Sequence, residues 1–259
     1  MLRSTLLCSA IAAAPASAEG GFIDHFKSLD PSRWYVAHYD FRHPHFDTDW
    51  RRENVEILAN PSETGLKLHL HPHSDGINRF AGASVRTHTP SHYGFYEAEF
   101  RAAKGPGLVT GIFTYTGPHY GTRHDEIDIE VLGRDTTSLN IAWFVDGALH
   151  QRTVPLGFDA ADCIHTYGFH WQLDRITWFI NGKAIFEVND TQALIPKVPG
   201  HFFVNLWAAD PSIKAWAGVA EASQRANANV KTLAFTPSSS ETDKVEKVRF
   251  KRVAHPSDQ

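Results

Sequence analysis

The sequence predicts an all-β protein, a sandwich or jelly roll of antiparallel strands. Short runs of residues alternate between apolar and polar with a period of two, and turn residues separate these runs along most of the chain. Helical periodicity is weak. The Ala-rich stretch 215–228 lacks a continuous apolar face, so we expect a short helix or an irregular loop there. There is no internal repeat and no long linker, which favours one domain.

In the first half of the chain, strands are expected at 66–71 (LKLHLH) and 93–101 (YGFYEAEFR). Within the second segment, Tyr96, Ala98 and Phe100 alternate with charged residues. Successive side chains of a strand point to opposite faces, so these three residues are expected to face the core.

In the second half, two dipeptides favour tight hairpins. Asp146-Gly147 and Asn181-Gly182 can both adopt the positive φ angles that a two-residue type I′ turn needs. The expected strands are 139–145 and 148–154 around the first turn, 176–188 as a hairpin around the second, 202–207 (FFVNLW) and 245–253 (VEKVRFKRV), the last preceded by an exposed polar connection at 236–243.

Residues 1–18 have the pattern of a signal peptide. Arg3 gives a positive start, an apolar stretch follows at 6–14, and residues 16–18 (ASA) match a small-residue cleavage site. The apolar stretch is too short to span a bilayer. We therefore expect residues 19–259 to form a single exported domain, secreted or periplasmic.

Charge and cysteine content limit the classes of partner. A net charge of −4 gives no electrostatic basis for binding nucleic acid or an anionic membrane. After signal cleavage Cys163 would be the last cysteine, so no intrachain disulfide can form. Its apolar neighbour Ile164 favours a small buried side chain over a nucleophile.

The segment 124–133 (HDEIDIEVLG) gives the strongest functional indication. Glu126, Asp128 and Glu130 alternate strictly with β-branched apolar residues, so a strand places three carboxylates on one face. Like charges in a row repel one another, and a scaffold has no use for them. Glycoside hydrolysis does: one carboxylate attacks or stabilises the sugar carbon, and another, kept protonated, gives the leaving oxygen its proton.

The alternative is an exposed strand with an acidic outer face. Aromatic content argues against it, because the chain has 7 Trp, 7 Tyr and 17 Phe, several of them in neighbouring expected strands. Aromatic faces pack in β cores and also stack on the apolar faces of sugar rings. The catalytic interpretation is favoured.

With these segments in view, the chain resembles glycoside hydrolase family sixteen, the laminarinase and lichenase family of retaining glycosidases. Within it, the chain is most similar to bacterial endo-β-1,3-1,4-glucanases and exopolysaccharide glycanases. The resemblance implies a β-jelly-roll sandwich of two antiparallel sheets with a substrate cleft on the concave face. It rests on four segments in the family's order and spacing: 111–118 (GIFTYTGP), 124–137 (HDEIDIEVLGRDTT), 156–171 (LGFDAADCIHTYGFHW) and 205–207 (NLW).

The resemblance also implies catalytic roles. Glu126 would be the nucleophile, Glu130 the general acid and later base, and Asp128 a residue that tunes the pair. Crowded carboxylates cannot all ionise easily, which agrees with this division. The expectation that the anomeric configuration is retained rests on the resemblance. On a straight strand positions i and i+4 lie about 13–14 Å apart at Cα, whereas retaining enzymes hold their carboxyls about 5–5.5 Å apart.

Departures from the lichenase pattern concentrate around the expected cleft. Polar side chains that hydrogen-bond to sugar hydroxyls allow an enzyme to discriminate strongly between substrates. Their loss therefore favours an acidic or substituted polysaccharide over plain mixed-linkage glucan. His124 stands where lichenases have an aromatic residue, and Phe144 stands where they have a tyrosine. Arg42 and Ala142 each replace an asparagine. Small residues at 81–83 replace an acidic and basic pair before Ser84, and Arg86 adds positive charge. The substrate-binding residues implied by the resemblance are Phe113, Tyr115, His124, Phe144, Asn205, Trp207, Trp216 and Arg42.

Histidines are dense in the N-terminal third, and His69 and His71 share one strand face. No third ligand is in register, so surface or hydrogen-bonded roles are favoured over metal binding, and no cofactor is expected. Family members often hold a structural calcium through an acidic residue of the last strand, which corresponds to Glu246 here; this site stays open.

These observations predict a secreted, monomeric, endo-acting retaining β-glycanase. Its substrate would be a β-1,3/1,4-linked glucan or a glucose-containing bacterial exopolysaccharide, cleaved by double displacement. One alternative is a transglycosylase on the same residues, in which a sugar takes the covalent intermediate. The other is a lectin-like carbohydrate-binding module, which would have no reason to keep both Glu126 and Glu130.

Overall fold

The computed structural model describes residues 20–60 and 63–238, and their regular secondary structure is almost entirely β-strand. Helical elements in this part of the chain are brief: α1 (Lys214–Ala217), η1 (Arg52–Asn54), η2 (Pro118–Tyr120) and η3 (Pro211–Ile213). The strands are β1 (Phe22–Asp24), β2 (Trp34–Val36), β3 (Thr48–Trp50), β4 (Val55–Asn60), β5 (Glu63–Pro72), β6 (Phe80–Thr87), β7 (Gly94–Arg101), β8 (Leu108–Thr116), β9 (Asp125–Leu132), β10 (Ser138–Val145), β11 (Ala148–Pro155), β12 (His165–Trp171), β13 (Arg175–Ile180), β14 (Lys183–Asn189), β15 (His201–Ala208) and β16 (Ala226–Pro237).

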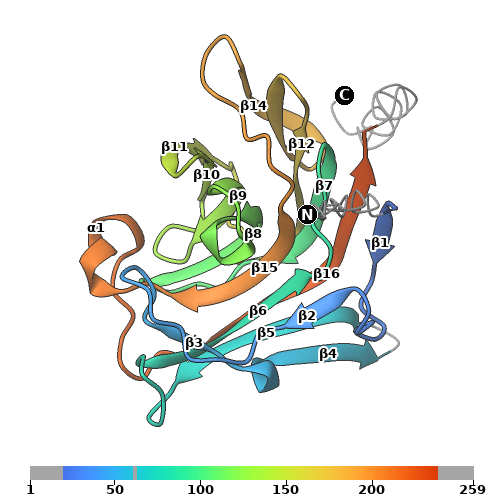
Figure 1. Cartoon of the computed structure of the whole chain (residues 1–259). Coiled ribbons are helices and arrows are strands. Elements are labelled where there is room, and N and C mark those ends of the chain that lie inside the picture. Colours follow the sequence, from blue (N-terminus) through green and yellow to red (C-terminus); the bar gives the residue numbers. More distant parts are fainter. Residues whose placement is uncertain (1–19, 61–62, 239–259) are drawn as a thin grey trace, which may run out of the picture.

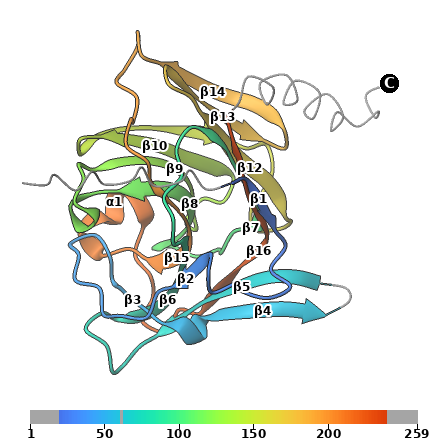
Figure 2. The same cartoon turned by 45° about the vertical axis from the view of Figure 1, so that its right-hand side comes forward.

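The strands form two layers, shown in Figures 1 and 2. The front sheet has the order β11-β10-β9-β8-β15-β6, with β2 also paired to β6. The back sheet has the order β5-β16-β7-β12-β13-β14, with β4 paired to β5 and β1 to β16. A short β5–β6 pairing joins the layers. Apart from the parallel β3–β6 pair, the strand pairs are antiparallel, which confirms the predicted all-β sandwich.

The core lies between the two sheets and is built by the predicted alternation. From the front sheet, Ile127 and Ile129 of β9 are fully buried. From the back sheet, Tyr96, Ala98 and Phe100 of β7 are fully buried too, as their alternation with charged residues predicted. Burying large apolar side chains from both layers stabilises the sandwich, at roughly 25 cal/mol for each Å² of apolar surface removed from water.

The two expected hairpin turns are confirmed by their backbone angles. Asp146 and Gly147 have φ of 52° and 80°, and Asn181 and Gly182 have φ of 48° and 76°. Positive φ at both central positions matches the right-handed twist of the flanking strands. The β10–β11 and β13–β14 hairpins follow from these angles.

The C-terminal part differs from the expectation. The Ala-rich stretch yields only the four-residue α1, and strand β16 then runs from Ala226 to Pro237 through part of the expected polar connection. The strand was missed because its pairing with β7 shifts register between Val230 and Thr232, which breaks the period of two. The expected final strand 245–253, Glu246 and the signal peptide 1–18 lie outside the described residues.

The prediction that Cys163 is buried is wrong: its side chain is exposed, and its neighbour Ile164 is 42% exposed. Both lie in the turn between β11 and β12. Asp159 fixes that turn by accepting hydrogen bonds from the Ala161 N–H and the Thr136 hydroxyl. An apolar neighbour in sequence therefore does not indicate a core position here. In the described part of the chain, no helix is long and apolar enough to cross a membrane.

Candidate active site

Strand β9 lies inside the front sheet between β8 and β10 and carries the three acidic residues. Its isoleucines point into the core, so its carboxyls point to the opposite side, here called the outer face of the front sheet. Figure 2 shows β8, β9 and β10 side by side. The strand register places three rows across this face: Tyr115–Glu126–Phe144, Phe113–Asp128–Ala142 and Gly111–Glu130–Asn140.

Asp128, the middle acidic residue, is 5% exposed. Burial raises its pKa well above the ordinary value, and the charges of Glu126 and Glu130 and a hydrogen bond with Glu126 act in the same direction. Its Oδ2 atom is buried and has no hydrogen-bond partner among the described residues. These effects favour the neutral form of the Asp128 carboxyl.

Glu130 is also pushed toward the neutral form. Burial and then the charge of Glu126 raise its pKa to about 8, against a partial opposing effect of the Asn140 amide. That amide nitrogen lies 3.5 Å from Oε2. Gly111, opposite Glu130 on β8, leaves space: a Cβ there would lie 3.5 Å from Glu130 Cγ and 3.1 Å from Asn205 Oδ1. Glu130 can thus donate a proton at neutral pH.

Glu126 is the acidic residue that is held by a base. The Nε2 atom of His124 lies 2.6 Å from its Oε2 atom. The His124 ring stacks on Phe144, with centroids 4.6 Å apart, and meets the Tyr115 ring edge-on at 5.3 Å. Because the neutral forms of Asp128 and Glu130 are favoured, Glu126 is the carboxyl of the three that is suited to carry the negative charge.

Asp125, the first residue of β9, is a structural anchor that sequence reasoning missed. It is 2% exposed, and its Oδ2 accepts hydrogen bonds from the main-chain N–H groups of Lys197 and Val198. Its Oδ1 accepts from Asp146 in the β10–β11 turn. Burial raises its pKa, but these bonds and that from Arg123 outweigh burial and lower it. The start of the catalytic strand is thereby tied to two loops.

The expected aromatic residues reach the outer face, and each has a partner. Phe113 stacks on Phe203 with centroids 4.8 Å apart. Trp207 is only 4% exposed, because Phe46 stacks on it at 4.0 Å; Trp216 lies 6.1 Å away. Sequence reasoning missed Phe46, which comes from an irregular segment without periodicity. One face of Trp207 is therefore closed to sugar.

Asn205 belongs to the row of Glu130, since it pairs with Gly111 on β8. Its Oδ1 atom is buried without a hydrogen-bond partner among the described residues. The indole nitrogen of Trp216 is also buried and has no partner there. Buried polar atoms without partners are costly in a folded protein. Both atoms are suited to hydrogen bonds with sugar hydroxyls.

The small residues expected in the cleft at 81–83 need a correction. Ala81 and Ala83 are fully buried, and Ala83 belongs to the core. Because faces alternate along β6, the outer face receives Gly82, Ser84 and Arg86, of which the last two pair with Asn205 and Phe203 of β15.

The basic residues differ in setting. Arg86 lies with its guanidinium carbon 4.5 Å from the Tyr35 ring centroid and 5.6 Å from that of Tyr120. Arg42 is exposed, in the segment that also holds Phe46. Arg42 thus lies in the segment whose Phe46 stacks on Trp207, whereas Arg86 lies in the row of Asp128.

The N-terminal histidines are engaged in hydrogen bonds. His69 Nε2 lies 2.8 Å from Glu56 Oε2, and His71 Nε2 lies 2.8 Å from Asn54 Oδ1. Within residues 20–60 and 63–238, no three His, Cys, Asp or Glu side chains come together as a metal site.

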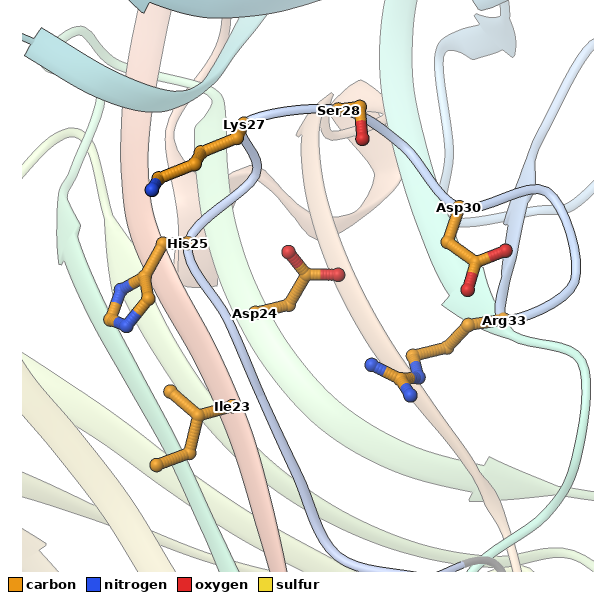
Figure 3. Close-up of a pocket in the computed structure, with 7 residues that line it drawn as sticks. All are labelled: Ile23, Asp24, His25, Lys27, Ser28, Asp30 and Arg33. Atoms are coloured by element: carbon orange, nitrogen blue, oxygen red, sulfur yellow. The ribbon is translucent and has the colours of Figure 1, made fainter.

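A surface pocket lies away from the carboxylates, along β1 of the back sheet, and is shown in Figure 3. Its Asp24 accepts hydrogen bonds from the Phe26 N–H at 2.8 Å and the Trp34 indole at 2.6 Å. This carboxylate is committed to holding the N-terminal segment, and the pocket adds nothing to the chemistry of the outer face.

Comparison with known proteins agrees with this geometry. The model of glycosyl hydrolases family 16 matches residues 42–231. The chain belongs to glycosyl hydrolase family 16. It is therefore a glycoside hydrolase, as predicted, and its two-layer sandwich is the family 16 jelly roll.

Relatives within family 16 cover most of the chain. A beta-glucanase of Bacillus amyloliquefaciens is 37% identical over 78% of this chain and 81% of its own length. The solved Bacillus licheniformis beta-glucanase superposes with a TM-score of 0.78 at 33% identity, over 85% of this chain and 99% of that one. A beta-1,3-1,4-glucanase (lichenase) from a mouse hindgut metagenome gives 0.78 at 32% identity, over 85% and 100%.

Proposed function

We propose that this family 16 enzyme is an endo-acting, retaining β-glycanase that cleaves a β-1,3/1,4-linked glucan bearing acidic groups. We further propose that it is exported and acts as a monomer without a cofactor. The relatives named beta-glucanases support the linkage class. The distribution of charge over the three carboxyls of β9 carries the mechanism.

In the first step, a carboxylate oxygen of Glu126 attacks the anomeric carbon and forms a glycosyl ester. The glycosidic C–O bond breaks as the leaving oxygen takes the proton of Glu130. A pKa of about 8 keeps that proton on Glu130 until it is needed. A single ionised carboxylate beside two neutral ones suits this step, because nucleophile and acid need opposite protonation states.

In the second step, Glu130 is the ionised base. It takes a proton from water as the water oxygen attacks the anomeric carbon, and Glu126 leaves as a carboxylate. Asp128, whose neutral form is favoured and which is hydrogen-bonded to Glu126, stabilises the returning negative charge on Glu126. A sugar hydroxyl in place of water would give transglycosylation on the same residues.

The Arg86 guanidinium supports an acidic polymer. It lies on the outer face, and burial, followed by the charge of Arg86, lowers the pKa of the neighbouring His201 to about 4. His201 pairs with Tyr115, in the row of Glu126, and is neutral at neutral pH. The charge of Arg86 can attract carboxylate, acyl-acid or pyruvyl groups on a polysaccharide.

Two measurements test the proposal. Proton NMR during cleavage should show the β-anomer first, since double displacement retains configuration; an initial α-anomer would exclude the mechanism. Reducing-end release should then be compared across lichenan, laminarin, xyloglucan, agar and acidic exopolysaccharides. Longer oligosaccharides among the products would instead identify a transglycosylase.

A further inference from the structure

His124 occupies a distinctive place in the active site. It directly precedes β9, and its side chain lies on the outer face beside that of Glu126, two residues further along. Its ring is fixed from two sides, by the parallel face of Phe144 at 4.6 Å and the edge contact with Tyr115 at 5.3 Å. Both partners pair directly with Glu126 across the sheet. The imidazole therefore has little freedom to turn away.

The contact between His124 and Glu126 has a defined direction. An ionised carboxylate has no proton to give, so the proton between Nε2 and Oε2 belongs to the imidazole. At 2.6 Å this is a short, charge-assisted hydrogen bond. The His124 and Glu126 side chains are 30% and 16% exposed, so water competes weakly for either partner.

We propose that His124 is a positioning residue that holds the Glu126 carboxylate in the orientation for attack on the sugar. The Nε2–H group binds Oε2 and, together with the hydrogen bond between Asp128 and Glu126, fixes the carboxylate. His124 thus acts on turnover through Glu126 rather than by binding substrate. The inference rests on the proposed nucleophilic role of Glu126.

Other groups around His124 do not replace this bond. The nearby hydroxyl of Tyr115 keeps its proton, because burial and then the charge of Glu126 raise its pKa. Arg123 is directed to Asp125, with Nη2 3.0 Å from Oδ2. The Asp146 main chain also bonds to Asp125.

Two substitutions separate the hydrogen bond from the packing. His124→Phe keeps the aromatic ring against Phe144 but removes the donor, and His124→Gln keeps a donor at a similar reach. We expect His124→Phe to lower kcat about 10- to 100-fold with KM unchanged within about threefold, because a displaced nucleophile costs turnover on this scale. His124→Gln should recover most of the loss. His69→Phe is the matched control, since it removes a similar His–Glu bond, 2.8 Å long, on β5 of the back sheet; its kcat should stay at the wild-type value.

A double variant distinguishes this inference from the proposed function. In Glu126→Ala rescued by azide, His124 has no carboxylate to position, so adding His124→Phe should cost less than about threefold. Failure of azide to rescue Glu126→Ala would remove the nucleophile assignment itself. Four results would overturn the role of His124: wild-type kcat in His124→Phe, a rise in KM at constant kcat, no recovery in His124→Gln, or an undiminished loss in the rescued background.

Discussion

Trp178 of the back sheet donates its indole N–H to the main-chain carbonyl of Asp128 in the front sheet, with 3.1 Å between the heavy atoms. This hydrogen bond crosses the core directly behind the acidic row. The carbonyl belongs to the middle residue of the candidate catalytic triad, so the position of β9 depends on the packing of the opposite layer.

Removing this donor should therefore affect both folding and turnover. Trp178→Phe removes the buried indole donor of this hydrogen bond, which we expect to lower the free energy of unfolding by about 1–3 kcal/mol, with a further loss from the smaller ring. Trp34→Phe is the control, because the buried Trp34 donates its indole N–H to Asp24 of β1 at 2.6 Å, away from β9. Urea denaturation should show a loss in both variants, and kcat should fall only in Trp178→Phe.

The two glutamates should respond differently to chemical rescue. Glu126→Ala is expected to lose nearly all cleavage and to regain part of it with azide or formate, which can fill the vacated nucleophile site. Glu130→Ala should keep activity on aryl glycosides with good leaving groups, which need no proton. Initial rates on both substrate types, with and without the anions, check the assignment. The opposite pattern would exchange the two roles.

The raised pKa of Asp128 predicts how kcat/KM declines at alkaline pH. Both Glu130 and Asp128 have raised pKa values, so rising pH removes the proton of Glu130 and also favours a negative charge on Asp128 beside Glu126. Asp128→Asn stays neutral at every pH. The variant should fold and bind normally, turn over more slowly, and lose kcat/KM less steeply above the Glu130 pKa. Superimposable wild-type and variant profiles would reduce Asp128 to a spacer.

Glu130 should lower the stability of the fold at neutral pH. Its pKa is raised from 4.5 to about 8, so the folded protein keeps a proton that the unfolded chain releases. The free energy of unfolding therefore falls as the pH rises from 4.5 to about 8, and below pH 4.5 Glu130 causes no such loss. Glu130→Gln should unfold with a free energy about 1–3 kcal/mol higher than wild type at pH 7, shrinking to no difference near pH 4. Thermal melts at several pH values measure this; a constant difference would contradict it.

The substrate proposal predicts dependence on salt. Lichenan should be a poor substrate, and an acidic bacterial exopolysaccharide a better one whose KM rises as ionic strength increases from about 50 to 500 mM. Arg86→Gln, and Arg42→Ala on the exposed segment, should raise KM at low salt and flatten this dependence. Arg175→Gln, on β13 beside Asp174, is the charge-matched control. Efficient lichenan hydrolysis without any gain on anionic polymers would refute the acidic substrate.

Much of this site could be predicted from local pattern. The period of two in 124–133 placed three carboxyls on one face, and two dipeptides located the hairpins. The remaining features depend on contacts between distant segments. Phe46 covers Trp207, Asp125 binds the 197–198 loop, and the turn around Asp159 exposes Cys163. None of these contacts leaves a periodic trace in the sequence.

The division of β9 into an apolar and an acidic side has a consequence for how such an enzyme can change over evolutionary time. Residues that pack in the core and residues of the outer face alternate along one strand, and the same alternation continues into β10. Outer-face positions such as Ala142, Phe144 and Gln151 can be exchanged while the sandwich keeps its core. New polymer preferences can therefore arise by single substitutions that leave the fold unharmed.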